Sequence, residues 1–490
     1  MVTPISHCEM APMAAGLCQG GEVNAKHVVV VGGGISGLAA AWYLHREGMR
    51  VTVLEGSPSV GGKLRTSEIA GQHLDEGAES VVTRRPEGLD LIEDLGLSDE
   101  LIHPGAAGSS VYSHGGLRPL PAGQIMGVPS DLVALAQSGV VSQAGVARAA
   151  LDLAKRPTPR GSDVSVADYV ADRLGREVLD RLVEPLLGGV YAGRVERLSF
   201  EATLPQFAQA AHTQRSLIMR ARELKEASSA QSGPVFATLR DGMGALPVLM
   251  AGILAKEGVN LRTEAMVREL GRTPEGWRVV MGSAQAPEVL EADAVVLAVP
   301  ASPAGRLLSG TVPAAASELA GIEYASMAII SLAYHSTAFP SFPKGTGYLV
   351  PYVEGRDVKA VTFSSVKWPG RRGHDPGTVL VRASIGRFGE EHALQRSDAE
   401  LKAAVMAELA TTCAVSELPV DARITRWGGA LPQYDVGHLD RVARVRAAVA
   451  GHRGLAVCGA AYDGVGIPAC ISTARAAAAR IIDQLREEEP

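Results

Sequence analysis

The apolar residues near the start of the chain follow two different patterns. Residues 28–31 are four consecutive valines, and a short continuous run of β-branched residues is typical of a buried parallel strand. Residues 38–46 have the composition of a helix, which Gly48 ends, and residues 49–54 form a second apolar run. The pattern therefore predicts a β-strand, an α-helix and a second β-strand parallel to the first.

The pattern changes several times farther along the chain. Between residues 130 and 225, apolar residues recur at three- and four-residue spacing, which predicts helices. Residues 322–425 contain strand-like runs separated by polar turns, and they predict an antiparallel sheet. Continuous apolar runs at 292–301 and 454–459 return to the buried-strand pattern, and a long alanine-rich helix follows from about Ile471.

These segments predict an α/β protein with a discontinuous dinucleotide-binding domain. A chain of 490 residues is too long for one hydrophobic core. We expect the N-terminal, a middle and the C-terminal part of the chain to form the dinucleotide-binding domain, with two other domains inserted between them. The expected boundaries are 1–26 for a disordered extension, 27–105, 235–300 and 426–490 for the dinucleotide-binding domain, 106–234 for a mainly helical domain, and 301–425 for an antiparallel-sheet, substrate-binding domain.

A glycine-rich turn joins the first predicted strand to the first helix. Gly32, Gly34 and Gly37 fit the spacing G-x-G-x-x-G, in which the glycines permit a tight turn, close approach of the backbone to a pyrophosphate, and close packing of the helix on the strand. Glu55 ends the second strand, where its carboxylate can accept hydrogen bonds from both hydroxyls of an adenosine ribose. Lys63 follows on a second glycine turn, and we expect it to approach the phosphates.

Another glycine-rich turn, near the C-terminus, favours a flavin over a nicotinamide. Residues 464–466 lie between the last predicted strand and the long helix. Backbone N–H groups and the positive end of a helix dipole can stabilise negative charge on a reduced isoalloxazine. An NAD-dependent dehydrogenase usually completes its site within one contiguous block, whereas this chain returns to the cofactor from its C-terminal end.

The composition argues against several other classes of protein. The net charge is −6 and there is no basic tract, which argues against nucleic acid as a partner. The five cysteines are scattered, and they fit reduced thiols in the cytoplasm better than disulfides or a zinc site. Residues 1–26 lack the pattern of a signal peptide, and no apolar run is long enough to span a membrane. Peripheral contact of an amphipathic helix with a membrane is an alternative to packing within the protein.

Four stretches of the sequence resemble flavoproteins. The FAD fingerprint of the flavin amine oxidase superfamily is similar to VVVVGGGISGLAAAWYL followed by VTVLEGSPSVGGKLRT. The porphyrinogen oxidase family is similar to EPLLGGVYAGRVERLSF, RWGGALPQYDVGHLDRV and GAAYDGVGIPACI. Within it, the resemblance is greatest to the bacterial coproporphyrinogen III oxidases of the oxygen-dependent, coproporphyrin-type haem pathway. It covers roughly residues 27–485 and implies the Rossmann-like FAD-binding fold of the superfamily.

The resemblance implies a reaction. It is the FAD-dependent oxidation of coproporphyrinogen III to coproporphyrin III, with dioxygen as the acceptor and hydrogen peroxide as the product, in haem biosynthesis. Transient contact with downstream enzymes of the haem pathway would accompany it. Because hydride transfer depends on alignment in a dry cavity more than on a strong base, we assign no catalytic acid or base, and we assign no metal.

The resemblance also implies roles for individual residues. It implies a cofactor site formed by Gly32, Gly33, Gly34, Ile35, Ser36, Gly37, Glu55, Gly56, Lys63, Gly77, Ala78, Glu79, Ser80, Val267, Trp427, Val465, Gly466 and Ile467. Gly189 and Val190 would face the substrate. The propionates need cations, for which Arg84 and Arg85 are the expected candidates, although an adjacent arginine pair can also be a solvated surface loop. Amine oxidases carry a lysine near the flavin, and here we expect Ile330 in its place.

Two classes of alternative stay open. The protein could be an oxidase of another substrate, such as protoporphyrinogen IX, a polyamine or a carotenoid. It could also be a non-enzymatic carrier like the GDP-dissociation inhibitors, which share this fold without flavin chemistry. The intact turn at 32–37, Glu55 and residues 464–467 argue against the carrier.

Overall fold

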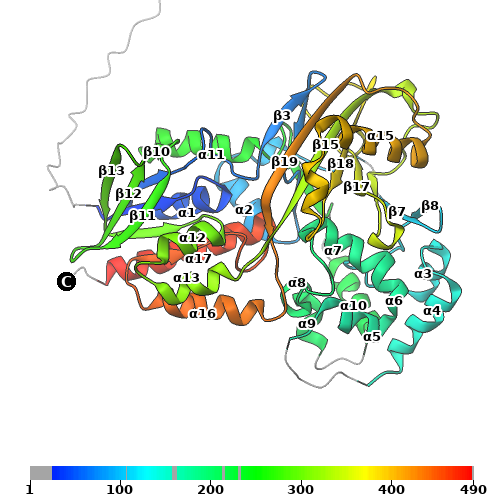
Figure 1. Ribbon diagram of the computed structural model, residues 1–490, viewed down its shortest axis with the longest axis horizontal. Coiled ribbons are helices and arrows are strands. Elements are labelled where there is room, and N and C mark those ends of the chain that lie inside the picture. The colour runs from blue at the N-terminus through cyan, green and yellow to red at the C-terminus, as the bar shows by residue number, and fades with distance from the viewer. Residues whose placement is uncertain (1–24, 106–107, 157–162, 212–215, 230–232, 488–490) are drawn as a thin grey trace, which may run out of the picture.

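The computed structural model describes residues 25–105, 108–156, 163–211, 216–229 and 233–487 (Figure 1). Nearly all of the extension expected at 1–26 therefore lies outside the described residues. None of the helices in the described residues combines the length and the hydrophobicity that a membrane-spanning segment needs. The same residues contain no cluster of three or more His, Cys, Asp or Glu side chains that could hold a metal ion.

A five-stranded parallel sheet forms the first layer, as the apolar runs predict. Its strands follow the order β10-β2-β1-β14-β20, with bounds Asn260–Arg262, Arg50–Leu54, His27–Val31, Ala294–Leu297 and Leu455–Val457. Side chains alternate between the two faces of a strand. Val28 and Val30 accordingly lie in one core, and Val29 and Val31 lie in another. Both faces of β1 are buried, which explains a continuous apolar run in place of an alternating one.

Different elements cover the two faces of this sheet (Figure 1). One face packs against α1 (Ile35–Arg46), α2 (Pro86–Asp94), α11 (Ala245–Lys256) and α17 (Ile467–Arg486). The other packs against a three-stranded sheet of β11 (Val267–Arg272), β12 (Trp277–Gly282) and β13 (Pro287–Ala292), and against α12 (Ala301–Leu308), α13 (Pro313–Ala320) and α16 (His438–Ala450). This doubly covered layer confirms the predicted Rossmann-like fold.

A seven-stranded mixed sheet forms the second layer. Its order is β19-β15-β18-β17-β16-β7-β8, with bounds Asp421–Pro432, Tyr324–His335, Thr378–Ile385, Val358–Phe363, Gly347–Leu349, Ser110–Ser113 and Gly116–Pro119. Neighbouring strands are antiparallel except β16 and β7, which are parallel. One face packs on α15 (Asp398–Cys413), and α14 (Ser364–Lys367) follows β17. The opposite face is turned toward the dinucleotide-binding layer.

Short helices form a third region below the second sheet (Figure 1). They are α3 (Leu132–Ser138), α4 (Gln143–Ala150), α5 (Val166–Leu174), α6 (Arg176–Val178), a π-helical turn (Leu179–Val183), α7 (Glu184–Tyr191), α8 (Phe200–Thr203), α9 (Pro205–Ala211) and α10 (Leu217–Ser229). The buried carboxylate of Asp152 accepts hydrogen bonds from Arg173 Nε (2.5 Å), Ser216 Oγ (2.5 Å) and the Ile218 backbone (3.1 Å). One charged group therefore ties α5 to α10.

Two small sheets complete the fold. The hairpin of β3 (Thr66–Ile69) and β4 (Gln72–Asp75) leads into the loop at 76–80. The strands β5 (Val81–Val82), β9 (Phe236–Leu239) and β6 (Leu101–Ile102) pair in the order β5-β9-β6.

The layers cross the predicted domain boundaries in three places. Helices α12 and α13, at 301–320, belong to the core of the dinucleotide-binding layer and not to the second sheet. Strands β7 and β8 pair with the second sheet, although they lie in the segment assigned to the helical domain. Strand β19 runs through the boundary at 425/426. Periodicity identifies the type of an element, but the sheet that the element joins depends on long-range pairing.

Candidate active site

A cavity of about 560 Å³ lies where the layers meet. Its floor is formed by residues that follow β1, β14 and β20, namely Gly32, Gly34–Ser36, Ala298–Pro300 and Gly459–Ala461. Gly33 does not line it. Strand β1 stands between β2 and β14 in the sheet, so the connections diverge at this point. Ligands of open α/β sheets bind in such a crevice at the carboxyl ends of the strands.

Three glycines in the turn after β1 each meet a different steric requirement. Gly32 has φ of 109°, and a Cβ there would lie 2.7 Å from the Ala298 carbonyl oxygen. A Cβ on Gly37 would lie 1.8 Å from the Gly32 carbonyl oxygen, so only glycine lets α1 approach β1. A Cβ on Gly34 would meet no protein atom within 4 Å, because that position faces the cavity. The turn leaves room for a ligand at the point where the fingerprint predicts a pyrophosphate.

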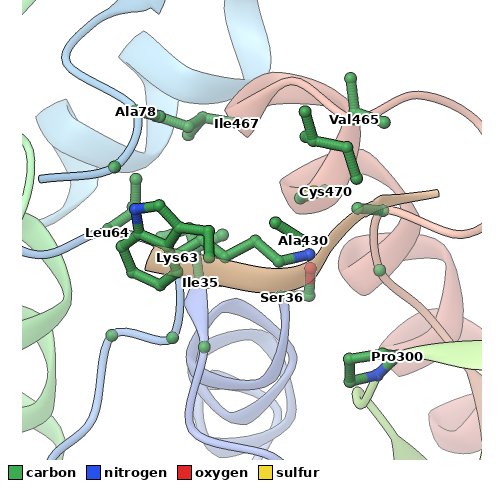
Figure 2. A pocket seen from close by; sticks show the side chains of 18 of the residues that line it. Ile35, Ser36, Lys63, Leu64, Ala78, Pro300, Ala430, Val465, Ile467 and Cys470 are labelled. Carbon is green, nitrogen blue, oxygen red and sulfur yellow. The ribbon is translucent and has the colours of Figure 1, made fainter. Parts of the chain in front are cut away.

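Two helix N-termini border the same cavity. Figure 2 shows Ile35 and Ser36 at the start of α1, and Ile467 and Cys470 at the start of α17. Neither helix has a side-chain cap, since Gly34 and Gly466 occupy the N-cap positions. The first N–H groups of each helix lack partners within the helix, and the helix dipole adds positive charge there. The cavity can therefore stabilise negative charge at two separate points.

Glu55 is held rigidly at the edge of the cavity. One carboxylate oxygen accepts from the Gly33 backbone N–H at 2.6 Å, and the other accepts from the Ser57 N–H (2.8 Å) and Oγ (2.7 Å). The Ala265 N–H donates to the Glu55 carbonyl oxygen at 2.8 Å, which brings the start of β11, Val267, near this end. Val267 itself does not line the cavity, and a Cβ on Gly56 would lie 2.7 Å from Met266 Cε.

Lys63 carries its charge into the cavity. Its side chain extends into the pocket in Figure 2. Burial lowers the pKa of the ammonium group. The aromatic ring of Tyr324 lies 5.9 Å from Nζ, but among the described residues no carboxylate forms an ion pair with Lys63. A half-buried cation without a carboxylate fits an anionic ligand such as a phosphate.

The loop at 76–80 forms the next part of the wall. A Cβ on Gly77 would lie 1.8 Å from the Lys63 carbonyl oxygen, so the two loops pack backbone to backbone. Ala78 lines the cavity, whereas Glu79 and Ser80 do not. Glu79 forms ion pairs with Lys367 and Arg382. Burial acts to raise the pKa of Glu79, but these two cations lower it to about 2. The carboxylate is therefore ionised and paired behind the loop.

The second sheet supplies the opposite wall. Met327 and Ile329 of β15 and Trp427 of β19 line the cavity, and the Trp427 indole donates to the Glu76 carbonyl oxygen at 2.8 Å. Because side chains alternate along β15, Ile330 points away from the cavity into the core beneath α15. The expectation that Ile330 stands at the flavin is therefore wrong. The cavity-facing residue next to it is Ile329.

The helical region closes the cavity from a third side. Gly189 and Val190, at the end of α7, both line it, and 39% of the Val190 surface is exposed. Arg84 and Arg85 do not line it. Arg84 donates to the Ser228 carbonyl oxygen at 2.5 Å, and Arg85 pairs with Glu87 at 2.5 Å. The two arginines thus bind the protein itself, at the loop before α2.

Several lining residues were not identified from the sequence. Residues 298–300 and 459–461 follow predicted buried strands, so the rule that ligands bind at carboxyl ends of parallel strands could have found them. Tyr324, Met327 and Arg382 had no such signal. They lie on the long strands β15 and β18, where the order of apolar and polar residues does not indicate which face of the sheet contacts a ligand.

The fold and the cavity together define a dinucleotide-binding protein whose cavity extends from the nucleotide turn to the second sheet. The sequence model of the family described as "Flavin containing amine oxidoreductase" matches residues 35–482. The chain belongs to this family. Its cofactor is accordingly FAD, which the residues of the cavity fit: the glycine turn, Lys63 and Glu55 would hold the phosphates and ribose, and the start of α17 would lie at the isoalloxazine.

Individual relatives agree with this family. The chain is similar to the coproporphyrinogen III oxidase of Mycobacterium bovis, at 40% identity over 93% of this chain and 97% of the relative. It is also similar to the coproporphyrinogen III oxidase of Bacillus subtilis, at 32% identity over 92% of this chain and 97% of the relative. A crystal structure from Exiguobacterium sp. 255-15, provisionally described as a protoporphyrinogen oxidase, superposes with a TM-score of 0.81 at 31% identity and covers 95% of this chain and 99% of that one.

Replacing Glu55 by alanine is expected to weaken FAD binding and to leave the chemistry intact. The ribose would lose its pair of charge-assisted hydrogen bonds to the carboxylate, a loss of about 1.5–3 kcal/mol in total, so the Kd should rise about 10- to 100-fold. Titration of the FAD-free protein with FAD, followed by flavin fluorescence, measures this. Glu68→Ala, at an exposed carboxylate on β3, is the control. A Glu55→Ala protein that binds FAD normally but turns over slowly would contradict the assignment.

Proposed function

We propose that this protein oxidises coproporphyrinogen III to coproporphyrin III, with dioxygen as electron acceptor and hydrogen peroxide as product. The main structural support for this proposal is the shape of the cavity. A single cavity extends from Glu55 and the nucleotide turn to a chamber walled by Val190, Met327 and Ile329. Apolar surface of this kind suits the macrocyclic ring of a porphyrinogen, and the named bacterial relatives at 40% and 32% identity act on coproporphyrinogen III according to their names.

The residues of the chamber can align a substrate and exclude water. The turn at 32–37, Glu55 and Lys63 would hold FAD, which would supply the two-electron acceptor for a hydride from a bridging carbon and the route for those electrons to dioxygen. Hydride transfer needs close, aligned approach in a dry site. Val190, Met327 and Ile329 supply apolar surface from two different elements, α7 and β15. Their task is to hold the flexible macrocycle with a bridging carbon toward the cofactor and to keep water away from it.

Among the described residues that line the cavity, both carboxylates already have hydrogen-bonding or charged partners. Glu55 is hydrogen-bonded at the nucleotide end. Glu76 is buried and pairs with Arg65 at 3.3 Å and with Arg423 at 3.5 Å. Lys63 lies at the phosphate turn. This arrangement supports a reaction driven by positioning, and the side chains of β15 that face the cavity, Met327 and Ile329, differ from the lysine of amine oxidases.

Turnover of two porphyrinogens by the FAD-loaded protein tests the proposal. We expect kcat/KM for coproporphyrinogen III to exceed that for protoporphyrinogen IX by at least about tenfold. Protoporphyrinogen IX has vinyl groups in place of two of the propionates, so it would leave polar groups of the site unpaired, and a site discriminates strongly against such a substrate. Porphyrin fluorescence and peroxide release measure the rate, and anaerobic samples are the control. Equal or faster turnover of protoporphyrinogen IX would make the protein a protoporphyrinogen oxidase. Failure with both would leave a flavoprotein acting on another substrate.

A further inference from the structure

One positive charge lies in the otherwise apolar wall of the substrate chamber. Arg382 lies on β18, directly opposite Ser331 of β15, and its side chain lines the cavity with Met327 and Ile329. Only 13% of the Arg382 side chain is exposed. A guanidinium in such surroundings has lost most of its hydration, so it needs a compensating partner. Lys63 is the other cation in the lining, and it lies at the nucleotide end.

The partners of Arg382 do not balance its charge. One terminal NH₂ group donates to the Gly77 carbonyl oxygen, and the other lies 3.4 Å from a carboxylate oxygen of Glu79. Glu79 also pairs with Lys367, so one carboxylate faces two cations. Arg371, which is nearby, is paired separately with Asp75.

The hydrogen-bonding capacity of Arg382 is also incomplete. Its Nε is buried and has no hydrogen-bond partner among the described residues. Because this Nε has almost no accessible surface, a ligand in the cavity would meet the guanidinium at its terminal NH₂ groups, each of which has a second N–H to donate. A carboxylate supplies the missing negative charge and accepts hydrogen bonds from such groups, which is why arginine is suited to bind it.

We propose that Arg382 binds a propionate carboxylate of the porphyrinogen and thereby positions the macrocycle in the chamber. The inference rests on the proposed function for the identity of the ligand. Arg382 replaces Arg84 and Arg85 as the candidate for this role, because Arg382 lines the cavity and those two arginines do not. Glu79 and Gly77 hold the guanidinium in place at the chamber wall.

Replacing Arg382 by glutamine or methionine tests the proposal in the FAD-loaded protein. Glutamine can keep a hydrogen bond to Gly77 without the charge, and methionine removes both. We expect the KM for coproporphyrinogen III and the Kd for coproporphyrin III to rise about 10- to 100-fold, the range that loss of a charge-assisted hydrogen bond produces. Binding of coproporphyrin III tetramethyl ester, which has no carboxylate, should not change. Arg382→Lys should restore part of the affinity for the free acid.

Two controls separate this role from a structural one. Arg423→Met removes another arginine of the second sheet, which pairs with Glu76 at 3.5 Å but does not line the cavity, and it should leave the binding of acid and ester unchanged. FAD binding should be normal in all Arg382 variants. If the acid and the ester weaken equally, or if FAD is lost, Arg382 acts by holding the loop at Gly77 and the proposal is overturned.

The same experiments keep the two proposals apart. A wild-type protein that does not oxidise coproporphyrinogen III contradicts the proposed function. A second outcome is that the wild-type protein oxidises coproporphyrinogen III while the Arg382 variants keep the wild-type KM and the wild-type preference for acid over ester. That result contradicts only the role of Arg382.

Discussion

Gly34→Val is expected to give a folded protein that does not retain FAD. Gly34 has φ of −75° and ψ of 178°, an extended conformation that any residue adopts. No protein atom lies within 4 Å of a Cβ placed there, so the fold can accept the larger side chain. The added methyl groups would occupy the space that the pyrophosphate needs. Overpacking of this kind costs up to about 3 kcal/mol, so the Kd for FAD should rise about 100-fold.

Colour, FAD titration and thermal unfolding of the FAD-free protein measure this result. Gly252→Val on α11 is a matched control, because that glycine also has no atom within 4 Å of its Cβ but does not line the cavity. Gly37→Ala is expected to behave differently from Gly34→Val, because it should prevent folding. Its Cβ would lie 1.8 Å from the Gly32 carbonyl oxygen, so folding itself should fail. A Gly34→Val protein that is yellow and binds FAD as the wild type does would show that the cofactor phosphates do not lie at this turn.

Glu79→Gln is expected to lower the free energy of unfolding at pH 7 by roughly 3 kcal/mol. The side chain is only 11% exposed, and its loss leaves Lys367 and Arg382 without their shared carboxylate. The pKa of Glu79 falls from its ordinary value of 4.5 to about 2 in the folded protein. Each unit of such a shift corresponds to about 1.4 kcal/mol of stabilisation.

The pH dependence distinguishes this contribution from a general packing defect. Because the folded-state pKa lies below the ordinary value, the carboxylate stabilises the folded protein fully above about pH 4.5 and loses that effect as the pH falls toward 2. The difference between wild type and Glu79→Gln should therefore shrink across that range in denaturant titrations. Glu288→Gln, at a mostly exposed ion pair with Arg262, should change the free energy of unfolding by less than about 1 kcal/mol. A difference that stays constant down to pH 2 would contradict the ionised pair.

The nucleotide end of the site could be predicted from a short stretch of sequence. Residues 27–55 contain a strand, a turn, a helix and a second strand in direct succession, so their contacts are set by chain neighbours and by the sterics of each glycine. The buried run at 28–31 faces two cores at once, and the turn at 32–37 has the geometry that its spacing predicts. Glu55 lines the cavity for the same reason, since a parallel neighbour strand must end beside the turn.

The wall of the cavity that the second sheet supplies was decided by the tertiary structure. Arg382 and Gly77 are about three hundred residues apart in the chain, yet they meet through the pairing of β18 in the second sheet. A shift of one residue along β15 exchanges Ile329 for Ile330 at the cavity, and the apolar pattern of a strand buried on both faces does not specify which of them faces the ligand. Arg84 and Arg85 have the charge that propionate binding needs, but Arg84 donates to the Ser228 carbonyl oxygen and Arg85 pairs with Glu87. Local sequence determines which element forms, whereas the partners of a side chain on a long strand depend on register and pleat, which only the assembled sheets fix.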